Sequence, residues 1–251
     1  MKLTPNVFLI GSGEYGLSHE FDCSVYLIID NDTREAVIID AGAGREPEHI
    51  LRNIIEDGID PHLVKAIFLT HEHADHVGGA PWLREKIGCK VYAPVGADEL
   101  IERGTDDELG LSIAKRSGVY APDYHYPHFK VDGTIADGDS FTIGKLQLQA
   151  ISLPGHSRHS MCYLLKGEKQ RALFTGDVVF FGGEIGLLNC PGSSLADYRA
   201  NIHKLANLNI EGLFPGHKVF VLKGGQQHLD RAISALGRLA VPPTFFQETC
   251  Y

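Results

Sequence analysis

The chain has 251 residues, of which 43% are hydrophobic, and this is enough to bury one large core, so we predict a single domain over residues 1–251. Its 32 acidic residues outnumber 23 basic ones and give a formal charge of −9, and no basic cluster forms a phosphate-binding stripe, which disfavours nucleic acid as a partner. The apolar run at residues 7–10 is too short for a secretory core or a membrane span, so no membrane partner and a cytosolic location are expected.

In chain order, the first predicted elements are short strands. Residues 25–29 and 36–39 flank a polar turn and predict an antiparallel hairpin. The spacing of apolar residues predicts the helices that follow, at residues 47–57, 81–87, 106–117, 195–208 and 226–239. Pro47 suits the first turn of the helix at 47–57, and a capping box at Ser194 precedes the helix at 195–208. This alternation of strands and helices predicts an α/β fold in which helices lie outside two facing sheets.

Four apolar runs end abruptly at a polar turn that contains histidine or aspartate. The runs cover residues 66–70, 148–153, 171–175 and 212–214, and they lead to His71, His156, Asp177 and His217 respectively. Strand ends are rigid and the loops beyond them are exposed, so this arrangement can bring several ligands to one edge of a core.

The segment from His71 to His76 contains four potential metal ligands, His71, His73, Asp75 and His76. A helix could not direct all four at one point, so two neighbouring ions are the more natural interpretation. Two sites need about eight coordination positions. These four residues together with His156, Asp177 and His217 supply seven, and a bridging solvent would complete the set. The glycine pair 78–79 relieves backbone crowding where the chain must turn.

These motifs resemble the metallo-β-lactamase superfamily, most closely its glyoxalase II-like dinuclear hydrolases, over residues 25–217. The resemblance rests on Ile39-Asp40-Ala41-Gly42, the HxHxDH block, Gly155-His156, Gly176-Asp177 and Gly216-His217, in that order. It implies a four-layer αββα sandwich of two mixed sheets with helices outside. It also implies a first metal held by His71, His73 and His156, a second held by Asp75, His76 and His217, and Asp177 bridging them. Asp40 would order the ligand loop through hydrogen bonds, and a plain turn residue is the alternative.

Two cations that share a solvent produce a metal-bound hydroxide at neutral pH, which predicts an enzyme that hydrolyses a small-molecule thioester, ester or lactone. Zinc is the first expectation for both ions, with iron or manganese possible. Asp75 and Asp177 are the predicted catalytic carboxylates.

Departures from known subfamilies narrow this prediction. His73 stands where the flavodiiron proteins have glutamate, which disfavours their redox reaction. Asp177 is present here, whereas true metallo-β-lactamases have no bridging aspartate, which disfavours β-lactam hydrolysis. Phe180 stands where the acyl homoserine lactonases have tyrosine, which removes their hydroxyl donor. Only 34 residues follow His217, so the glutathione-binding domain of glyoxalase II is not expected. A mononuclear iron dioxygenase like those acting on persulfides, a β-lactamase-like hydrolase and a metal-binding protein without catalysis remain alternatives.

The long segment at residues 101–129 is predicted to form a lid or pocket wall, with an ordinary packed loop as the alternative. Its end carries Tyr120, Tyr124, His125, Tyr126 and His128. The opposite wall is assigned to Phe180, Phe181 and glycines 182, 183 and 186, and His19 and His159 are further candidates for the cleft. Glu72 is expected to face solvent, as are His49, His62, His203 and His228.

Five scattered cysteines, Cys23, Cys89, Cys162, Cys190 and Cys250, form no CxxC pair and predict neither a disulfide framework nor a cysteine zinc site. Most are expected to be small buried residues. Cys190 lies in a predicted loop, where a structural role and an approach to the active site are both open.

Overall fold

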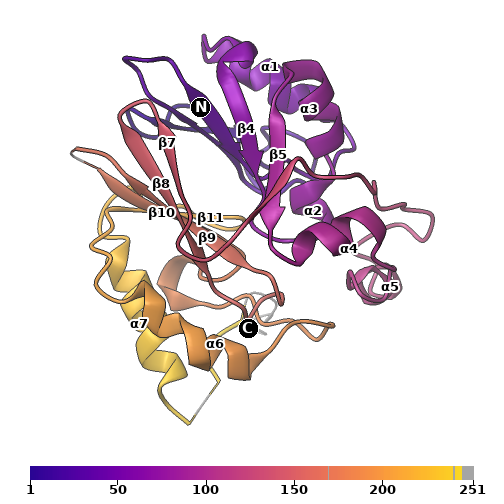
Figure 1. Cartoon of the computed structure of the whole chain (residues 1–251). Helices are drawn as coiled ribbons and strands as arrows, with labels where there is room; N and C mark the ends of the chain where they lie inside the picture. The colour runs from indigo at the N-terminus through magenta and orange to yellow at the C-terminus, as the bar shows by residue number, and fades with distance from the viewer. Residues whose placement is uncertain (169, 240, 245–251) are drawn as a thin grey trace.

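The computed structural model describes residues 1–168, 170–239 and 241–244, which form two facing β-sheets with helices on their outer faces (Figure 1). The predicted α/β class and the four-layer αββα arrangement of two mixed sheets are therefore confirmed. The single domain over residues 1–251 stays a prediction. No helix in the described parts of the chain is long and apolar enough to cross a membrane.

The first sheet has six strands in the order β1-β2-β3-β4-β5-β6. The first two pairings are antiparallel and the remaining three are parallel. The predicted hairpin of β2 and β3 is confirmed, with Tyr26 opposite Ile39 and Ile29 opposite Ala36. The strands are β1 (Val7–Gly11), β2 (Val25–Ile29), β3 (Ala36–Ile39), β4 (Val64–Phe68), β5 (Lys90–Pro94) and β6 (Gly133–Ile135).

The second sheet has five strands in the order β11-β10-β9-β8-β7. Only the pairing of β10 with β11 is parallel. Between the sheets lies an aromatic core in which Phe174 stacks on Phe214 at 5.2 Å and Phe68 approaches Tyr163. The strands are β7 (Ser140–Ile143), β8 (Leu146–Ser152), β9 (Met161–Lys166), β10 (Arg171–Gly176) and β11 (Gly212–Pro215).

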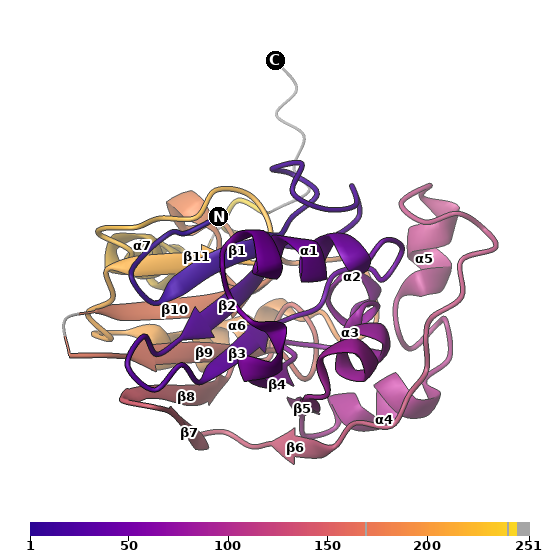
Figure 2. The same cartoon turned by 90° about the horizontal axis from the view of Figure 1, so that it is seen from above.

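The helices cover the two outer faces, and Figure 2 shows the sheets between them from above. On the first sheet lie α1 (Glu48–Glu56) and α3 (Ala80–Ile87), with the single turn α2 (Ala74–Val77) near its edge and α4 (Ala97–Arg103) and α5 (Leu111–Arg116) beyond it. On the second lie α6 (Leu195–Asn201) and α7 (Gln226–Leu236). Three short 3-10 helices are Pro61–Leu63, Phe181–Gly183 and Ile202–Leu205.

Three predicted helices are shorter in the structure, and the one expected at residues 226–239 ends at Leu236. The helix expected at residues 106–117 is confined to α5, because Gly110 takes a left-handed conformation with φ of 71° and starts the helix there. The helix expected at 195–208 is α-helical only to Asn201 and continues as a 3-10 turn to Leu205. The cap at Ser194 is confirmed, since its side chain accepts a hydrogen bond from the Asp197 amide at 3.1 Å. Helix α4 was not expected.

The fold brings five strand ends to one edge. Residues that follow the carboxyl ends of β3, β4, β8, β10 and β11 supply Asp40, His71, His156, Asp177 and His217. Two of these strands belong to the first sheet and three to the second. The site is therefore assembled across both sheets.

Candidate metal centre

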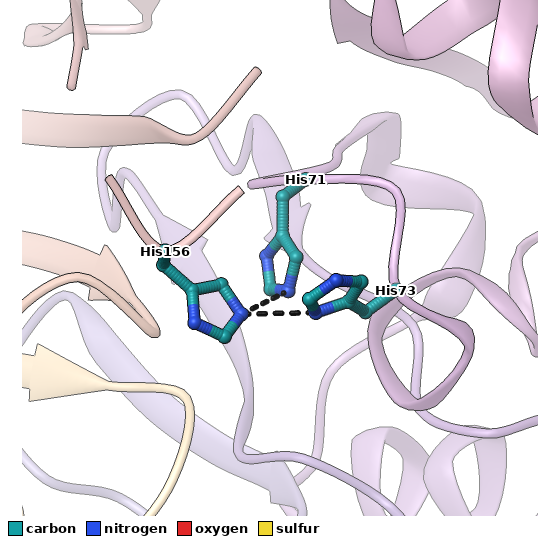
Figure 3. A group of neighbouring side chains, drawn as sticks. All are labelled: His71, His73 and His156. Atoms are coloured by element: carbon teal, nitrogen blue, oxygen red, sulfur yellow. Dashed lines mark hydrogen bonds between the residues drawn. The ribbon is translucent and has the colours of Figure 1, made fainter. Parts of the chain in front are cut away.

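Three histidine side chains converge on one point (Figure 3). Nε2 of His156 lies 3.2 Å from Nε2 of His71 and 2.9 Å from Nδ1 of His73. Nδ1 of His156 faces the Gly186 carbonyl at 2.6 Å, which leaves Nε2 directed at the other two rings. Burial lowers the pKa of His71 well below its usual value and that of His156 to about 4. Both rings thus favour the neutral form that metal ligation requires.

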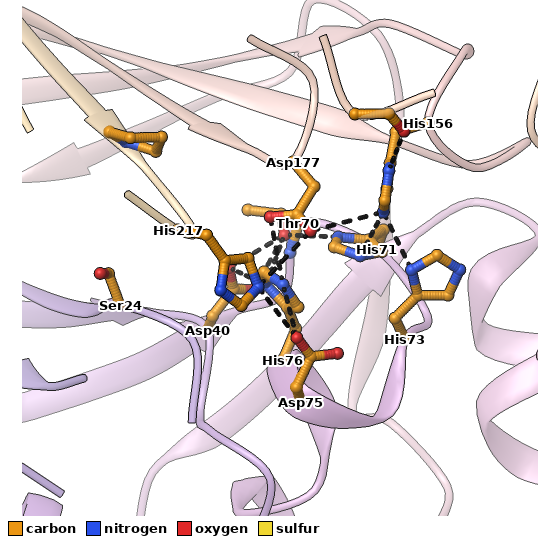
Figure 4. A network of polar contacts seen from close by, with 12 residues as sticks. Ser24, Asp40, Thr70, His71, His73, Asp75, His76, His156, Asp177 and His217 are labelled. Carbon is orange, nitrogen blue, oxygen red and sulfur yellow. Dashed lines mark hydrogen bonds and ion pairs between the residues drawn. The ribbon is translucent and has the colours of Figure 1, made fainter. Parts of the chain in front are cut away.

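A second group lies beside the first. Nε2 of His217 is 3.0 Å from Oδ2 of Asp75, and Nε2 of His76 is 3.6 Å from the same oxygen. Asp177 lies between the groups, with Oδ1 3.3 Å from His76 and Oδ2 3.6 Å from both His156 and His217 (Figure 4). The structure thus brings all seven predicted ligands together, and their binding of metal remains a prediction.

The second group is rich in negative charge. Burial opposes protonation of His76 and His217, but neighbouring Asp75 and Asp177 help to raise the pKa of each ring above its usual value. The carboxylates show the converse effect, since burial raises the pKa of Asp75 but His76 and His217 bring it down to about 2. Carboxylates buried beside imidazole nitrogens that can give up their protons form a donor set that suits divalent cations.

Two buried atoms support this fit directly. Nε2 of His76 and Oδ1 of Asp177 face each other, and within the described residues neither has a further hydrogen-bond partner. Buried polar atoms in native proteins are nearly always satisfied. A cation held at the second group would satisfy both, so the donor set fits a divalent metal ion there.

Asp40 organises the loop that carries the ligands. It follows β3 with a positive φ of 62°, and its Oδ1 accepts a hydrogen bond from the Thr70 amide at 2.8 Å. Its Oδ2 lies 2.9 Å from the Thr70 hydroxyl and 2.9 Å from Nδ1 of His76. Asp40 is therefore a turn residue that also contacts a ligand, and the two interpretations are compatible.

The HxHxDH block changes conformation in its middle. His73 is extended, with φ −69° and ψ 148°, and precedes α2, whereas Asp75 and His76 lie on that single helical turn. Gly78 and Gly79 pack so closely on the β3–α1 loop that a Cβ at either would lie 2.1 Å from the Ala43 or Ala41 carbonyl oxygen. The predicted role of this glycine pair in relieving crowding is confirmed.

Glu72 does not face solvent, and that prediction was wrong. Its side chain is buried, with a relative exposure of 4%, and its carboxylate contacts Ser157 and His159 in the loop after β8. The alternation of residues within the HxHxDH block carries no information about the second sheet. In the folded chain the loop of the second sheet covers the face of the HxHxDH segment that looks away from the metal centre.

A cavity of about 520 Å³ opens onto the centre, with His73, Asp75, His156, Asp177 and His217 among its lining residues. Helix α5 and its flanks form one wall, so part of the predicted segment, with eight residues between 109 and 120, does line the pocket. Tyr120 lines the cavity, whereas Tyr124 and Tyr126 are buried outside its lining and His125 and His128 are exposed.

The opposite wall differs from the predicted one. Leu187, Leu188, Asn189 and Cys190 line it, and Phe180, Phe181 and glycines 182, 183 and 186 do not. The prediction was wrong because Phe180 is fully buried in the fold and Phe181 packs on His228, with ring centroids 4.7 Å apart. The adjacent pair Leu187-Leu188, two apolar residues in a loop after Asp177, was the signal available in the sequence.

The remaining histidines differ in their exposure to solvent. His62 and His203 are exposed and His49 is half-buried, but His228 is buried and its Nδ1 accepts a hydrogen bond from the Gly182 amide at 2.9 Å. The solvated interpretation of His228 was therefore wrong, because α7 turns this side chain toward the segment after β10. His19 lines a separate surface hollow, and His159 is not in the lining of the metal cavity.

The cysteines of the described residues form no disulfide: Cys23, Cys89 and Cys162 are buried, and Cys190 is half-buried in the cavity wall. Cys250 lies outside the described residues. Of the two alternatives for Cys190, a structural role or a position near the candidate site, the structure supports the position near the site.

Comparison with known proteins adds to this geometry. Residues 20–217 match the family model of the metallo-beta-lactamase superfamily. The acyl-coenzyme A thioesterase MBLAC2 of Gallus gallus is 29% identical over 83% of this chain and 78% of its own, and a hydroxyacylglutathione hydrolase of Bdellovibrio bacteriovorus is 29% identical over 63% and 49%. A motif mutant of a metallo-beta-lactamase from Cronobacter sakazakii is similar in fold, with a TM-score of 0.72, 20% identity and 94% coverage of both chains.

Proposed function

The chain belongs to the metallo-beta-lactamase superfamily, as its motifs indicated, and we propose that it is a dinuclear metal-dependent hydrolase of acyl thioesters or esters. The observation that carries this proposal is the position of Asp177. Its Oδ2 lies 3.6 Å from His156 of the first group and 3.6 Å from His217 of the second, and its Oδ1 lies 3.3 Å from His76 of the second. A carboxylate between two ligand groups is suited to bridging two cations, and we propose zinc for both.

The protein side chains prepare this site in three ways. His71 and His156 of the first group are buried and favour the neutral form, Asp75 and Asp177 supply negative charge, and Asp40 fixes the ring of His76 by facing its Nδ1. Two divalent cations bound here would supply Lewis acidity, which lowers the pKa of a water and polarises a carbonyl oxygen. A hydrolytic reaction uses both effects.

The apolar side chains of the cavity walls indicate the nature of the acyl part of the substrate. Leu109, Leu111, Ile113, Val119, Leu187 and Leu188 line it, and so do Phe21 and Tyr120. Burial of apolar surface stabilises binding by about 0.8 kcal/mol for each methylene group. We therefore propose an apolar acyl chain that lies between α5 and the 187–190 segment, with its carbonyl at the ligand cluster.

The charged side chains that line the cavity indicate which leaving group the substrate carries. Apart from the histidines, every charged residue in its lining is acidic, namely Glu14, Glu20, Asp22, Asp75 and Asp177. Asp75 and Asp177 would be offset by the metal ions, and Glu14 and Glu20 are exposed. Because like charges repel, we propose a small or uncharged leaving group in preference to a polyanionic carrier.

Metal analysis and a substrate panel test this proposal. We expect two zinc ions per chain, and a higher kcat/KM for an uncharged octanoyl thioester or an aryl octanoate than for octanoyl-coenzyme A, an acyl homoserine lactone or penicillin. One iron per chain with oxygen consumption on a persulfide would instead establish the dioxygenase alternative. Leading activity on lactones or penicillins would overturn the substrate class, and no turnover of any activated ester would overturn hydrolysis.

A further inference from the structure

The carboxylate of Glu72 connects the two sheets next to the three-histidine group. Glu72 stands between His71 and His73, in the loop after β4 of the first sheet. Its Oε2 accepts a hydrogen bond from Ser157 Oγ at 3.1 Å, and its Oε1 lies 3.5 Å from Nδ1 of His159. Both partners belong to the loop between β8 and β9 of the second sheet, directly after His156.

This second loop is itself held in a compact turn. The Ser157 amide donates to Ser160 Oγ at 3.0 Å, and the His159 amide donates to Ser157 Oγ at 3.3 Å. Ser157 and Ser160 are both buried. Ser157 is therefore held in place by hydrogen bonds within its own loop. Because Ser157 directly follows His156, its contact with Glu72 also restrains the backbone of His156.

Two further segments enclose Glu72. Tyr126 is buried and its hydroxyl donates to the Glu72 carbonyl oxygen at 2.8 Å. Gly96 makes room for His159, because a Cβ at this glycine would lie 2.7 Å from the imidazole ring. The carboxylate is thus held within a packed polar network and is shielded from water. A buried carboxylate is costly unless it is hydrogen-bonded, so a structure in which the two loops separate is disfavoured.

We infer that Glu72 is a positioning residue that fastens the loop of His156 to the loop of His71 and His73. The three histidines come from different sheets, and His156 is 83 residues from His73 along the chain. The Met161 amide and the Tyr163 hydroxyl also join the sheets, at the carbonyls of Thr70 and Leu69 ahead of the ligands. The Glu72 contact differs in that it lies between His71 and His73 and reaches the residue next to His156. The inference rests on the proposed metal centre, since its consequence is tighter binding of the first metal ion.

The test measures zinc affinity separately at each ligand group, by competition with a chromophoric chelator. In a His217→Ala background, which keeps the three-histidine group, Glu72→Ala should weaken zinc binding by about 10- to 100-fold. Ser157→Ala should weaken it in the same direction. Glu72→Gln should recover part of the loss, because its amide oxygen still accepts from Ser157. In a His73→Ala background, which keeps the Asp75, His76 and His217 group, Glu72→Ala should change the affinity by no more than about twofold.

Asp30 provides a matched control for general damage to the fold. It is also a buried carboxylate that joins the two sheets, since its Oδ2 accepts from the Lys145 amide at 2.5 Å. It follows β2, which is antiparallel to β3, so it lies at the edge of the sheet opposite to Asp40 and the ligands. Asp30→Ala should lower the Tm of the metal-free protein and leave zinc affinity unchanged.

The outcomes separate the inference from the proposed function. Wild-type protein that binds no metal refutes the metal centre itself. Wild-type protein that binds two ions, combined with unchanged zinc affinity in Glu72→Ala and Ser157→Ala, refutes the positioning role alone. An equal loss of zinc affinity in Asp30→Ala would also refute it, because the effect would then come from weakened sheet packing. If Glu72→Ala fails to fold, Ser157→Ala and Glu72→Gln decide the question.

Discussion

Oδ2 of Asp40 lies 2.9 Å from Nδ1 of His76, and this contact directs Nε2 of His76 toward Asp177. The same carboxylate accepts hydrogen bonds from the amide and hydroxyl of Thr70. One buried side chain therefore connects the end of β3, the start of the ligand loop and a ligand ring.

Replacement of Asp40 by asparagine should weaken metal binding by the Asp75, His76 and His217 group. The side-chain amide of the asparagine would present a donor to a site where Thr70 already donates, and the ring of His76 would lose its orientation. We expect a loss of about 10- to 100-fold in zinc affinity, measured by chelator competition in the His73→Ala background. The control is Asp60→Asn, at an exposed cap of the 3-10 helix Pro61–Leu63. Equal affinities in both variants would contradict this role.

Loss of individual ligands should remove different ions. His71→Ala should lose the metal of the three-histidine group, His217→Ala that of the other group, and Asp177→Ala should weaken both because it lies between them. Metal content per folded chain tests this. Retention of two tightly bound ions by all three variants would reject the ligand assignment.

The Tm of wild-type protein should also fall when a chelator removes the metal, because ions that bind only the folded state stabilise it.

The two ligand groups should respond differently to pH. Burial lowers the pKa of His76 and His217, but neighbouring groups that include Asp75 and Asp177 raise it overall, so these rings still carry protons at a pH where ordinary histidines are neutral, and an incoming cation must displace them. Burial lowers the pKa of His71 and His156, which are already neutral there. Between pH 6 and 8, approximately, zinc affinity should therefore rise more steeply with pH in His73→Ala than in His217→Ala. Equal slopes would contradict the assignment.

The acyl chain should lie against Leu188. Leu188→Trp would fill part of the cavity between α5 and the 187–190 segment. We expect kcat/KM for an octanoyl thioester to fall by about tenfold or more, since each methylene that is no longer buried costs about 0.8 kcal/mol. The value for the acetyl thioester should change by about twofold at most. Ile55→Trp, on the exposed face of α1, is the control. An equal loss for both chain lengths would place the acyl group elsewhere.

Cys190 should be alkylated slowly at neutral pH. Its thiol is half-buried in the cavity wall, and burial together with the charge of Glu72 raises its pKa. A raised pKa reduces the thiolate fraction below that of an ordinary cysteine, so the rate with iodoacetamide should keep rising through alkaline pH. Peptide mapping by mass spectrometry would measure this rate, with Cys190→Ser as the blank. A rate that levels off near neutral pH would contradict the raised pKa.

The sequence by itself identified the side chains that converge in the candidate metal centre and much of the framework. The HxHxDH block, Asp177 and His217 could be identified because each follows an apolar run that forms a buried strand, and this is a local pattern. The hairpin of β2 and β3 and helix α7 also follow from local periodicity and turn residues. These features depend on neighbours within a few residues, which is the range that a sequence pattern covers.

Only the tertiary structure decided what faces the ligands from the other sheet. Glu72 is buried because the loop of Ser157 and His159 covers it, and these residues are 85 and 87 positions away along the chain. Leu187 and Leu188 lie in the cavity wall, whereas Phe180 is fully buried outside the cavity lining and Phe181 packs on His228. Burial of a side chain depends on which distant segment covers it, and strand spacing alone does not specify that segment.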